Sequence, residues 1–170
     1  MGFLDRFKKN SGLEVTEKPG CIYAPVSGKY ISLKEVNDGV FSEGVLGSGC
    51  GIIPEEGKLY APVGGTISTV ADTGHAIGIT TGDNAEYLLH IGLDTVDMGG
   101  KGFDVKVKSG SAVKAGQLLV EFDMEAIKKA GHKTTTIFVL TNEDDFEKLE
   151  IHTGNRYDAG TVIGSLKQGV

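Results

Sequence analysis

Four histidines are the side chains best suited to chemistry near neutral pH: His75, His90, His132 and His152. The ordinary pKa of histidine is about 6.5, and its neutral ring nitrogen can act as a nucleophile or a metal ligand. His132 follows Gly131 at the end of an expected helix, and His152 precedes a Thr-Gly pair, so we expect both at the surface. The other two histidines lie among apolar residues.

His75 and His90 each belong to an apolar stretch that predicts a β-strand. His90 ends Tyr-Leu-Leu-His, and His75 begins His-Ala-Ile-Gly-Ile. A single histidine in a strand would be expected to bond its ring to the backbone of the core. However, the polar run Thr80–Asn84 between the two strands predicts a hairpin, and paired strands bring opposite side chains together. A histidine pair at a glycine-lined surface predicts a nucleophilic centre or a metal site.

The two cysteines, Cys21 and Cys50, have neither the spacing of a metal site nor the number expected of a disulfide framework. We expect both to be small apolar side chains in a reduced, intracellular protein.

The elements that must position the histidines are expected to be short strands joined by glycine turns. Gly accounts for 26 of 170 residues, which is about twice its average usage of roughly 7%. Two segments repeat, Tyr23-Ala-Pro-Val-Ser-Gly-Lys-Tyr-Ile and Tyr60-Ala-Pro-Val-Gly-Gly-Thr-Ile. In each, we expect the proline to begin a strand. The repeat predicts two copies of one supersecondary unit in a single β domain.

Later segments extend this pattern. Four further stretches predict strands: Phe103–Lys108, Gln117–Phe122, Thr134–Leu140 and Thr161–Leu166. A short helix is expected over Met124–Ala130, with Asp123 as its N-cap and Gly131 after its end. Asn142 is expected to cap a helical turn over Glu143–Leu149. The predicted fold is all-β, an antiparallel sandwich or partly closed barrel of a dozen or so strands with duplicated topology and one or two short helices.

The first nineteen residues differ from the rest and divide the chain into a flexible segment, 1–19, and a domain, 20–170. Within residues 1–9, Phe3, Leu4 and Phe7 are flanked by Arg6, Lys8 and Lys9. Such a segment is either an amphipathic contact with an anionic membrane surface or a frayed tail. Both interpretations stay open.

Charge and hydropathy exclude several classes of function. The formal net charge of −6 argues against binding of nucleic acid, which requires a basic face. No apolar run approaches the roughly 20 residues that cross a bilayer, and the N-terminus lacks the features of a secretory signal. We therefore expect a cytoplasmic protein, with transient membrane association through residues 1–9 left open.

The motif around His90, His90-Ile-Gly-Leu-Asp-Thr-Val96, resembles the active-site signature of glucose-type enzyme IIA proteins of the bacterial phosphoenolpyruvate-dependent sugar phosphotransferase system. The similarity extends over roughly residues 20 to 168. Its further matches are Ala24–Gly28, Asp38–Phe41, Gly47–Gly49, Pro54, Ala61–Ile67, Thr73–Ala76, Gly102–Phe103, Val113–Gly116 and Phe122–Asp123.

This resemblance implies a phosphotransferase component with a phosphohistidine intermediate. His90 would accept a phosphoryl group from the histidine-containing phosphocarrier protein and pass it to a cysteine of the IIB domain of a sugar transporter. His75 would hold the phosphoryl oxygens with an N–H donor, and Thr73 would orient His75 through its other nitrogen. No cofactor is required, because both transfers are close to isoenergetic.

The resemblance also implies a docking surface on a monomer. Asp38 and Asp94 would flank the histidines and face cationic partners, whose encounter the net charge would favour. An apolar ring around them would comprise Val40, Phe41, Val45 and Val96. The sequence does not name the sugar that is transported.

Alternative functions remain. His90-x3-Asp94 fits the ligand spacing of zinc-dependent lysostaphin-like peptidases, but those enzymes also need a His-x-His pair, which is absent here. The possibility that His75 and His90 bind zinc stays open. Val105–Leu119 resembles the hairpin of biotinyl and lipoyl carrier domains, yet a helix is expected where they present a modified lysine. A non-catalytic regulatory binding module is the remaining alternative.

Overall fold

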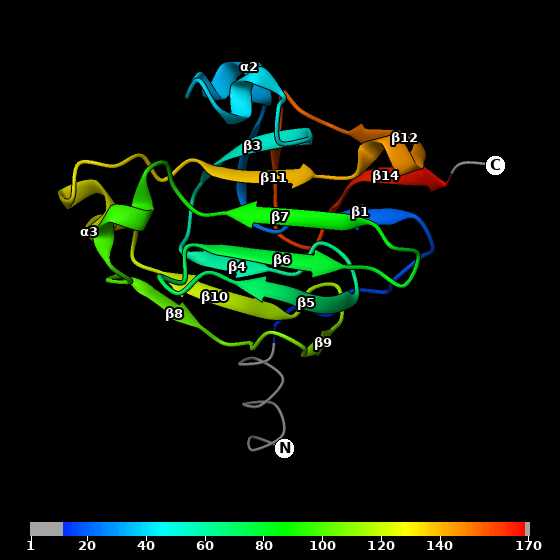
Figure 1. Ribbon diagram of the computed structural model, residues 1–170, viewed down its shortest axis with the longest axis horizontal. Helices are drawn as coiled ribbons and strands as arrows, with labels where there is room; N and C mark the ends of the chain where they lie inside the picture. Colours follow the sequence, from blue (N-terminus) through cyan, green and yellow to red (C-terminus); the bar gives the residue numbers. More distant parts are fainter. Residues whose placement is uncertain (1–11, 169–170) are drawn as a thin grey trace.

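The computed structural model describes residues 12–168 and is built almost entirely of antiparallel β-sheet (Figure 1). In this part of the chain there are fourteen strands in three sheets and two short α-helices. The predicted all-β fold is confirmed, and within these residues the sheets do not close into a barrel.

The largest sheet carries the functional site. Its eight strands follow the order β13 (Arg156–Tyr157), β2 (Gly28–Ser32), β3 (Ser48–Pro54), β11 (Thr136–Leu140), β7 (Glu86–His90), β6 (Ala76–Thr80), β5 (Gly65–Val70) and β9 (Ala112–Val113). One smaller sheet contains β1 (Cys21–Tyr23), β14 (Val162–Gln168) and β12 (Phe146–Ile151). The other contains β4 (Lys58–Tyr60), β10 (Leu118–Phe122) and β8 (Phe103–Val105).

One continuous core joins the three sheets. Its fully buried members include Ile22 of β1, Leu59 of β4, Ile67 of β5 and Leu89 of β7. A second, smaller cluster contains Ile31, Val36, Phe41, Ile137 and Val139. Because side chains alternate between the two faces of a strand, this second cluster lies on the face of the large sheet opposite the main core.

The repeated segments form two units that bond reciprocally. The N–H of Tyr23 donates to the carbonyl of Pro62 at 2.9 Å, and the N–H of Tyr60 donates to that of Pro25 at 2.8 Å. This exchange confirms the predicted duplication within one domain. The prolines, however, lie in the turns between β1 and β2 and between β4 and β5, so the prediction that they begin strands is wrong. In these turns the proline carbonyls accept the hydrogen bonds from the other unit.

A second pair of matching bonds extends the duplication beyond the repeat visible in the sequence. The N–H of Gly160 donates to the carbonyl of Ala24, and that of Gly116 donates to the carbonyl of Ala61. Each donor follows an alanine, in Asp-Ala-Gly and Lys-Ala-Gly respectively. The short Ala-Gly match was too weak to be recognised as a repeat from the sequence.

The two helices have local causes. Helix α3 (Met124–Lys129) is capped by Asp123, which accepts from the N–H of Ala126, and this confirms the predicted helix. Helix α2 (Leu33–Val36) was not predicted, although Ser32 and Glu35 form a capping box around its first turn. It is followed by the 3-10 turn η1 (Phe41–Glu43), which covers the second cluster.

The predicted helical turn over Glu143–Leu149 is largely wrong. Only Glu143–Asp145 forms a 3-10 turn, η3, and the chain then enters β12. Asn142 does not cap this turn, because its side chain accepts from the N–H of Glu86 and donates to the carbonyl of Asn84. No local sequence pattern indicates these bonds to the β6–β7 hairpin, which is distant in the sequence.

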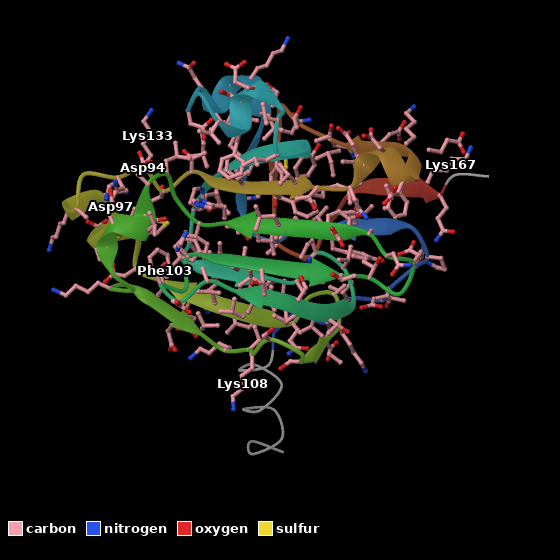
Figure 2. All side chains as sticks on the ribbon, in the orientation of Figure 1. Asp94, Asp97, Phe103, Lys108, Lys133 and Lys167 are labelled. Carbon is pink, nitrogen blue, oxygen red and sulfur yellow. The ribbon has the colours of Figure 1, made fainter. Side chains whose placement is uncertain are left out.

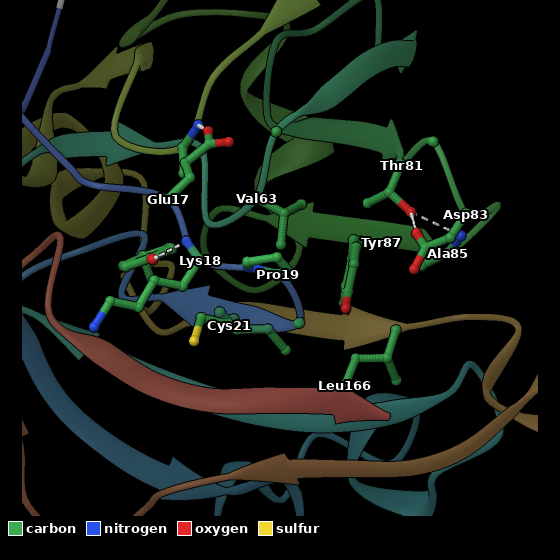
Figure 3. Close-up of a pocket in the computed structure, with 16 residues that line it drawn as sticks. Glu17, Lys18, Pro19, Cys21, Val63, Thr81, Asp83, Ala85, Tyr87 and Leu166 are labelled. Atoms are coloured by element: carbon green, nitrogen blue, oxygen red, sulfur yellow. Dashed lines mark hydrogen bonds between the residues drawn. The ribbon is translucent and has the colours of Figure 1, made fainter. Parts of the chain in front are cut away.

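Residues 12–19 run along the surface of the domain in contact with it. The N–H of Leu13 donates to the carbonyl of Gly116, and Glu17 accepts from the N–H of Ala115. With Cys21, Tyr87 and Leu166 from the sheets, Glu17 lines a pocket of about 370 Å³ (Figure 3). The predicted membrane contact through residues 1–9 lies outside the described residues, and the proposed domain boundary at residue 20 stays a prediction.

The helices of the described part of the chain include none with the length and apolar character needed to span a bilayer.

Candidate functional site

The strand β7 presents His90 on the face of the large sheet that carries the second cluster. Along this strand Tyr87 and Leu89 point into the main core, whereas Leu88 and His90 point to the opposite face. The ring of Phe41, from η1, lies 5.2 Å from that of His90 between centroids. The short segment after α2 therefore forms one wall of the site.

His75 reaches the same place from the neighbouring strand. Residue Ala76, the first of β6, pairs with His90, and the carbonyl of His75 accepts from the N–H of Ile91 at 2.7 Å. The two imidazole rings lie 4.9 Å apart between centroids at an angle of 79°. The predicted hairpin is confirmed, and it brings the two rings together.

The turn before His75 orients its ring. Gly74 has a φ of +74°, and a Cβ there would approach Val105 and Phe103 at 3.0 and 3.1 Å. The positive φ and the close approach to β8 both favour glycine at this position. The hydroxyl of Thr73 bonds to Nδ1 of His75. When this hydroxyl donates, the neutral ring carries its proton on Nε2 and can donate it to an anionic oxygen.

His90 has the opposite tautomer. Its Nδ1 lies 2.8 Å from the carbonyl oxygen of Gly92. A carbonyl can only accept a hydrogen bond, so Nδ1 carries the proton and Nε2 of the neutral ring keeps a free lone pair. The two histidines thus combine one nucleophilic nitrogen with one adjacent N–H donor. Gly92 lies within the motif around His90, but this role of its carbonyl depends on the fold and was not predicted from the sequence.

Both histidines favour their neutral forms. Burial, followed by repulsion from His75, lowers the pKa of His90 below its ordinary value of 6.5. The carbonyl of Gly92 and the carboxylates of Asp38 and Asp94 oppose this shift. Burial also lowers the pKa of His75. An uncharged imidazole at neutral pH is the form required for nucleophilic attack.

The carboxylates of Asp38 and Asp94 lie near enough to His90 to raise its pKa by charge attraction. Asp38 accepts from the N–H groups of Val40 and Ser42, at 3.1 and 2.9 Å, and thereby begins η1. Although partial burial acts to raise the pKa of Asp38, these hydrogen bonds hold it below its ordinary value. Asp94 lies beyond the end of β7, close to Asp97 (Figure 2). Both carboxylates are available to a cationic partner.

The apolar residues predicted around the histidines differ in exposure. Val40, Val45 and Val96 are 52%, 80% and 53% exposed, which is unusual for large apolar side chains. Phe41 is only 8% exposed and belongs to the second cluster, so it supports His90 instead of extending the exposed ring as predicted. Leu46, next to Val45 in the chain, is also exposed, at 41%. It was not predicted, although it directly follows Val45, which was assigned to the docking ring.

The ligands available for a metal at this site are few. Within residues 12–168, no three side chains from histidine, cysteine, aspartate and glutamate converge as a metal-binding group. A catalytic zinc site uses three protein ligands. Cys50 is fully buried, and burial raises the pKa of its thiol to about 12, so this cysteine is a structural side chain.

Comparisons with known proteins identify the family. A family model described as "phosphoenolpyruvate-dependent sugar phosphotransferase system, EIIA 1" matches residues 21–146. The chain is 40% identical over 165 residues to the "PTS system glucose-specific EIIA component" of Halalkalibacterium halodurans, covering 96% of this chain and 94% of that protein. The solved structure of glucose permease IIA from Mycoplasma capricolum superimposes with a TM-score of 0.81 at 37% identity, covering 89% of this chain and 98% of that one.

Other relatives are much longer proteins. The chain is 48% identical over 125 residues to the "PTS system beta-glucoside-specific EIIBCA component" of Bacillus subtilis, covering 74% of this chain. It spans only 20 to 23% of the length of this protein and two similar EIIBCA components. The same type of domain thus occurs both separately and fused to other components. These matches do not favour a peptidase or a regulatory module.

Proposed function

The chain belongs to the EIIA 1 family of the phosphoenolpyruvate-dependent sugar phosphotransferase system, and from this premise we propose that it is a phosphocarrier whose phosphorylated residue is His90. The observation that carries this assignment is the hydrogen bond from Nδ1 of His90 to the carbonyl of Gly92. This bond places the ring proton on Nδ1 and leaves the lone pair of Nε2 free to act as the nucleophile.

In the first transfer, the lone pair of His90 Nε2 attacks the phosphorus of the phosphohistidine on the histidine-containing phosphocarrier protein. The new N–P bond forms as the donor's N–P bond breaks, and the donor imidazole leaves as a neutral ring. The transition state is loose, so catalysis depends on positioning and on charge stabilisation. His75 supplies the latter by donating from Nε2 to a phosphoryl oxygen, while Thr73 holds its other nitrogen.

In the second transfer, the thiolate of a cysteine on a IIB domain attacks the phosphorus and His90 leaves as a neutral imidazole. The proton on Nδ1 stays with His90 throughout, because Nδ1 donates a hydrogen bond to the Gly92 carbonyl both before and after phosphorylation. The sugar is chosen by the membrane component that carries the IIB domain. The relatives named for glucose and for beta-glucosides leave both classes open for this chain.

Partners of both kinds would dock on one surface. Val40, Val45 and Val96 supply exposed apolar area, and Asp38 and Asp94 supply negative charge beside His90. Both partners would use this surface in turn, because the phosphoryl group must be transferred at the same nitrogen. Charged groups at the rim speed encounter more than they tighten binding, which suits a carrier that must release each partner.

The proposed transfers need no metal or other cofactor. His75 and His90 could supply two ligands to zinc, but its remaining ligands would have to come from outside the described residues. Zinc bound in this way would occupy the Nε2 atoms and so compete with the phosphoryl group.

The decisive test is phosphorylation in the presence of phosphoenolpyruvate, enzyme I and the phosphocarrier protein. The wild-type chain should acquire one phosphoryl group that is labile in acid and stable in base, and His90→Ala should acquire none. His132→Ala removes a histidine outside the site and should be labelled normally. Retention of the label by His90→Ala would overturn the assignment.

A further inference from the structure

The carbonyl that selects the tautomer of His90 belongs to a loop with an unfavourable backbone. Gly92 has a φ of +75°, and Asp94, two residues later, has a φ of +61°. Left-handed backbone is costly for a residue with a side chain. A loop of this kind keeps its shape only where neighbouring groups hold it.

Two backbone contacts hold part of this loop. The N–H of Ile91 donates to the carbonyl of His75 at 2.7 Å, and the N–H of Leu93 donates to the carbonyl of Lys133 at 3.0 Å. Figure 2 shows Lys133 beside Asp94 at this end of the molecule. The N–H of Leu93 belongs to the same peptide group as the carbonyl of Gly92, so its bond to Lys133 holds that peptide. Neither bond holds the carbonyl of Ile91, which belongs to the peptide group before Gly92.

The side chain of Thr95 supplies that restraint. Its hydroxyl donates to the carbonyl of Ile91, and the residue is fully buried. The carbonyl of Ile91 belongs to the peptide group that leads directly into Gly92. The methyl group of Thr95 lies against Gly92 so closely that a Cβ at Gly92 would collide with it. Thr95 therefore holds the peptide group before Gly92, whereas the bond from Leu93 to Lys133 holds the peptide group after it.

We propose that Thr95 is a positioning residue for phosphoryl transfer, and that its hydroxyl, together with the bond from Leu93 to Lys133, fixes the Gly92 carbonyl and through it the tautomer of His90. This inference rests on the proposed role of His90 as the nucleophile. Without the hydroxyl, the carbonyl of Ile91 loses its partner inside the protein, and the loop relaxes to satisfy it. The Gly92 carbonyl then moves away from Nδ1, and His90 populates the tautomer whose proton blocks Nε2.

Two substitutions separate the parts of the threonine side chain. Thr95→Val keeps the shape and the methyl contact but removes the hydroxyl, whereas Thr95→Ser keeps the hydroxyl and removes the methyl. Thr136→Val is the matched control, because Thr136 is also fully buried and its hydroxyl also donates to a nearby carbonyl, that of Thr134. Its hydroxyl has no contact with the loop of Gly92.

The first measurement is the ¹⁵N spectrum of the His90 ring in the unphosphorylated protein at pH 7.5. The wild type, Thr95→Ser and Thr136→Val should each show a protonated Nδ1 and a bare Nε2, whereas Thr95→Val should show a mixture of tautomers. Of the three variants, only Thr95→Val should be phosphorylated by the phosphocarrier protein about tenfold more slowly than the wild type. A single tautomer in Thr95→Val, or equal effects of Thr95→Val and Thr136→Val, would overturn the proposal.

A measurement on the wild type covers the case in which Thr95→Val does not fold. A buried hydroxyl bonded to a carbonyl gives a slowly exchanging proton resonance, and its absence for Thr95 would also contradict the proposal. The tautomer is read without any partner protein. Failure of this inference is thus distinct from failure of His90 to accept phosphate.

Discussion

The rings of His75, which directly precedes β6, and His90, which ends β7, stand nearly perpendicular, 4.9 Å apart between centroids. The two strands pair up to this point, where the carbonyl of His75 accepts from the N–H of Ile91. Their separation is therefore set by the register of β6 and β7 and not by flexible side chains. A phosphoryl group on Nε2 of His90 would find the N–H of His75 already in place. Because this donor is already positioned, it does not need to be reorganised during the transfer.

Replacing His75 by glutamine should separate the two transfers. His75→Gln leaves the nucleophile of His90 intact, so phosphorylation should persist, but delivery to the cysteine of a IIB domain should fall about a hundredfold, since a charge-stabilising donor is misplaced. The measurement is transfer of radiolabel from the purified phosphoprotein to a IIB domain. His132→Gln makes the same change outside the site and should transfer normally. Delivery by His75→Gln at the wild-type rate would exclude the role given to this residue.

The two histidines should also make the protein less stable in mild acid. Their pKa values are lowered in the folded state, so below pH 6.5 the unfolded chain binds protons that the folded chain does not. Stability from these groups is complete above pH 6.5 and declines as the pH falls toward the lowered values. Urea unfolding at pH 7.5 and 5.5 should show this decline, and it should be smaller in a variant with glutamine at both positions. An equal decline in both proteins would contradict the expectation.

A pH titration of the histidine rings, monitored by NMR, separates the causes of the lowered pKa of His90. The midpoint for His90 should lie below 6.5 in the wild type, because burial is the largest cause. In His75→Gln the charge repulsion is absent, so the midpoint should rise but remain below 6.5. A midpoint that does not move would mean that the two rings do not interact in solution.

The sequence predicted the histidine pair because its determinants are local. Two apolar stretches separated by a polar run define a hairpin, and the hairpin alone brings His75 beside His90. The helix α3 was predicted for the same reason, since Asp123 caps it from an adjacent position. The capping box of Ser32 and Glu35 is also local and could have revealed α2, although this helix was not predicted.

The features that could not be predicted depend on contacts between distant segments. Tyr87, Leu88 and Leu89 are all apolar, so no alternation shows which face of β7 meets the main core. The burial of Phe41 depends on η1 folding over Ile137 and Val139 of β11, nearly a hundred residues later. The turn prolines likewise accept hydrogen bonds from the other repeat, which a local pattern does not contain.

The exposed valines beside the histidines should contribute to partner binding and not to folding. The double variant Val40→Ser with Val96→Ser removes apolar area at two positions that are 52% and 53% exposed. Its KM for the phosphocarrier protein should rise about tenfold, while its thermal unfolding should change little. Val162→Ser changes a valine of similar exposure, 45%, on β14 and should leave the KM unchanged. An unchanged KM in the double variant would place the docking surface elsewhere.

A pair of glycines tests whether residues 12–16 lie against the domain as described. Gly116 and Gly110 have φ values of +88° and +92°, and each N–H donates to a backbone carbonyl. Replacement by alanine should therefore cost about 1–2 kcal/mol of backbone strain at both positions. At Gly110 a Cβ meets nothing within 4 Å, but at Gly116 it would approach Val15 Cγ2 at 2.7 Å and the carbonyl of Leu13 at 2.8 Å.

The contact with Leu13 and Val15 should make Gly116→Ala more destabilising than Gly110→Ala by about 1–3 kcal/mol, since the new methyl group overfills the contact. Urea unfolding of the two variants measures the difference directly. In chains that begin at residue 17, the two substitutions should have nearly equal effects, because the segment that the methyl group would strike is gone. If the two variants are equally stable in the full chain, residues 13–15 do not occupy this position in solution.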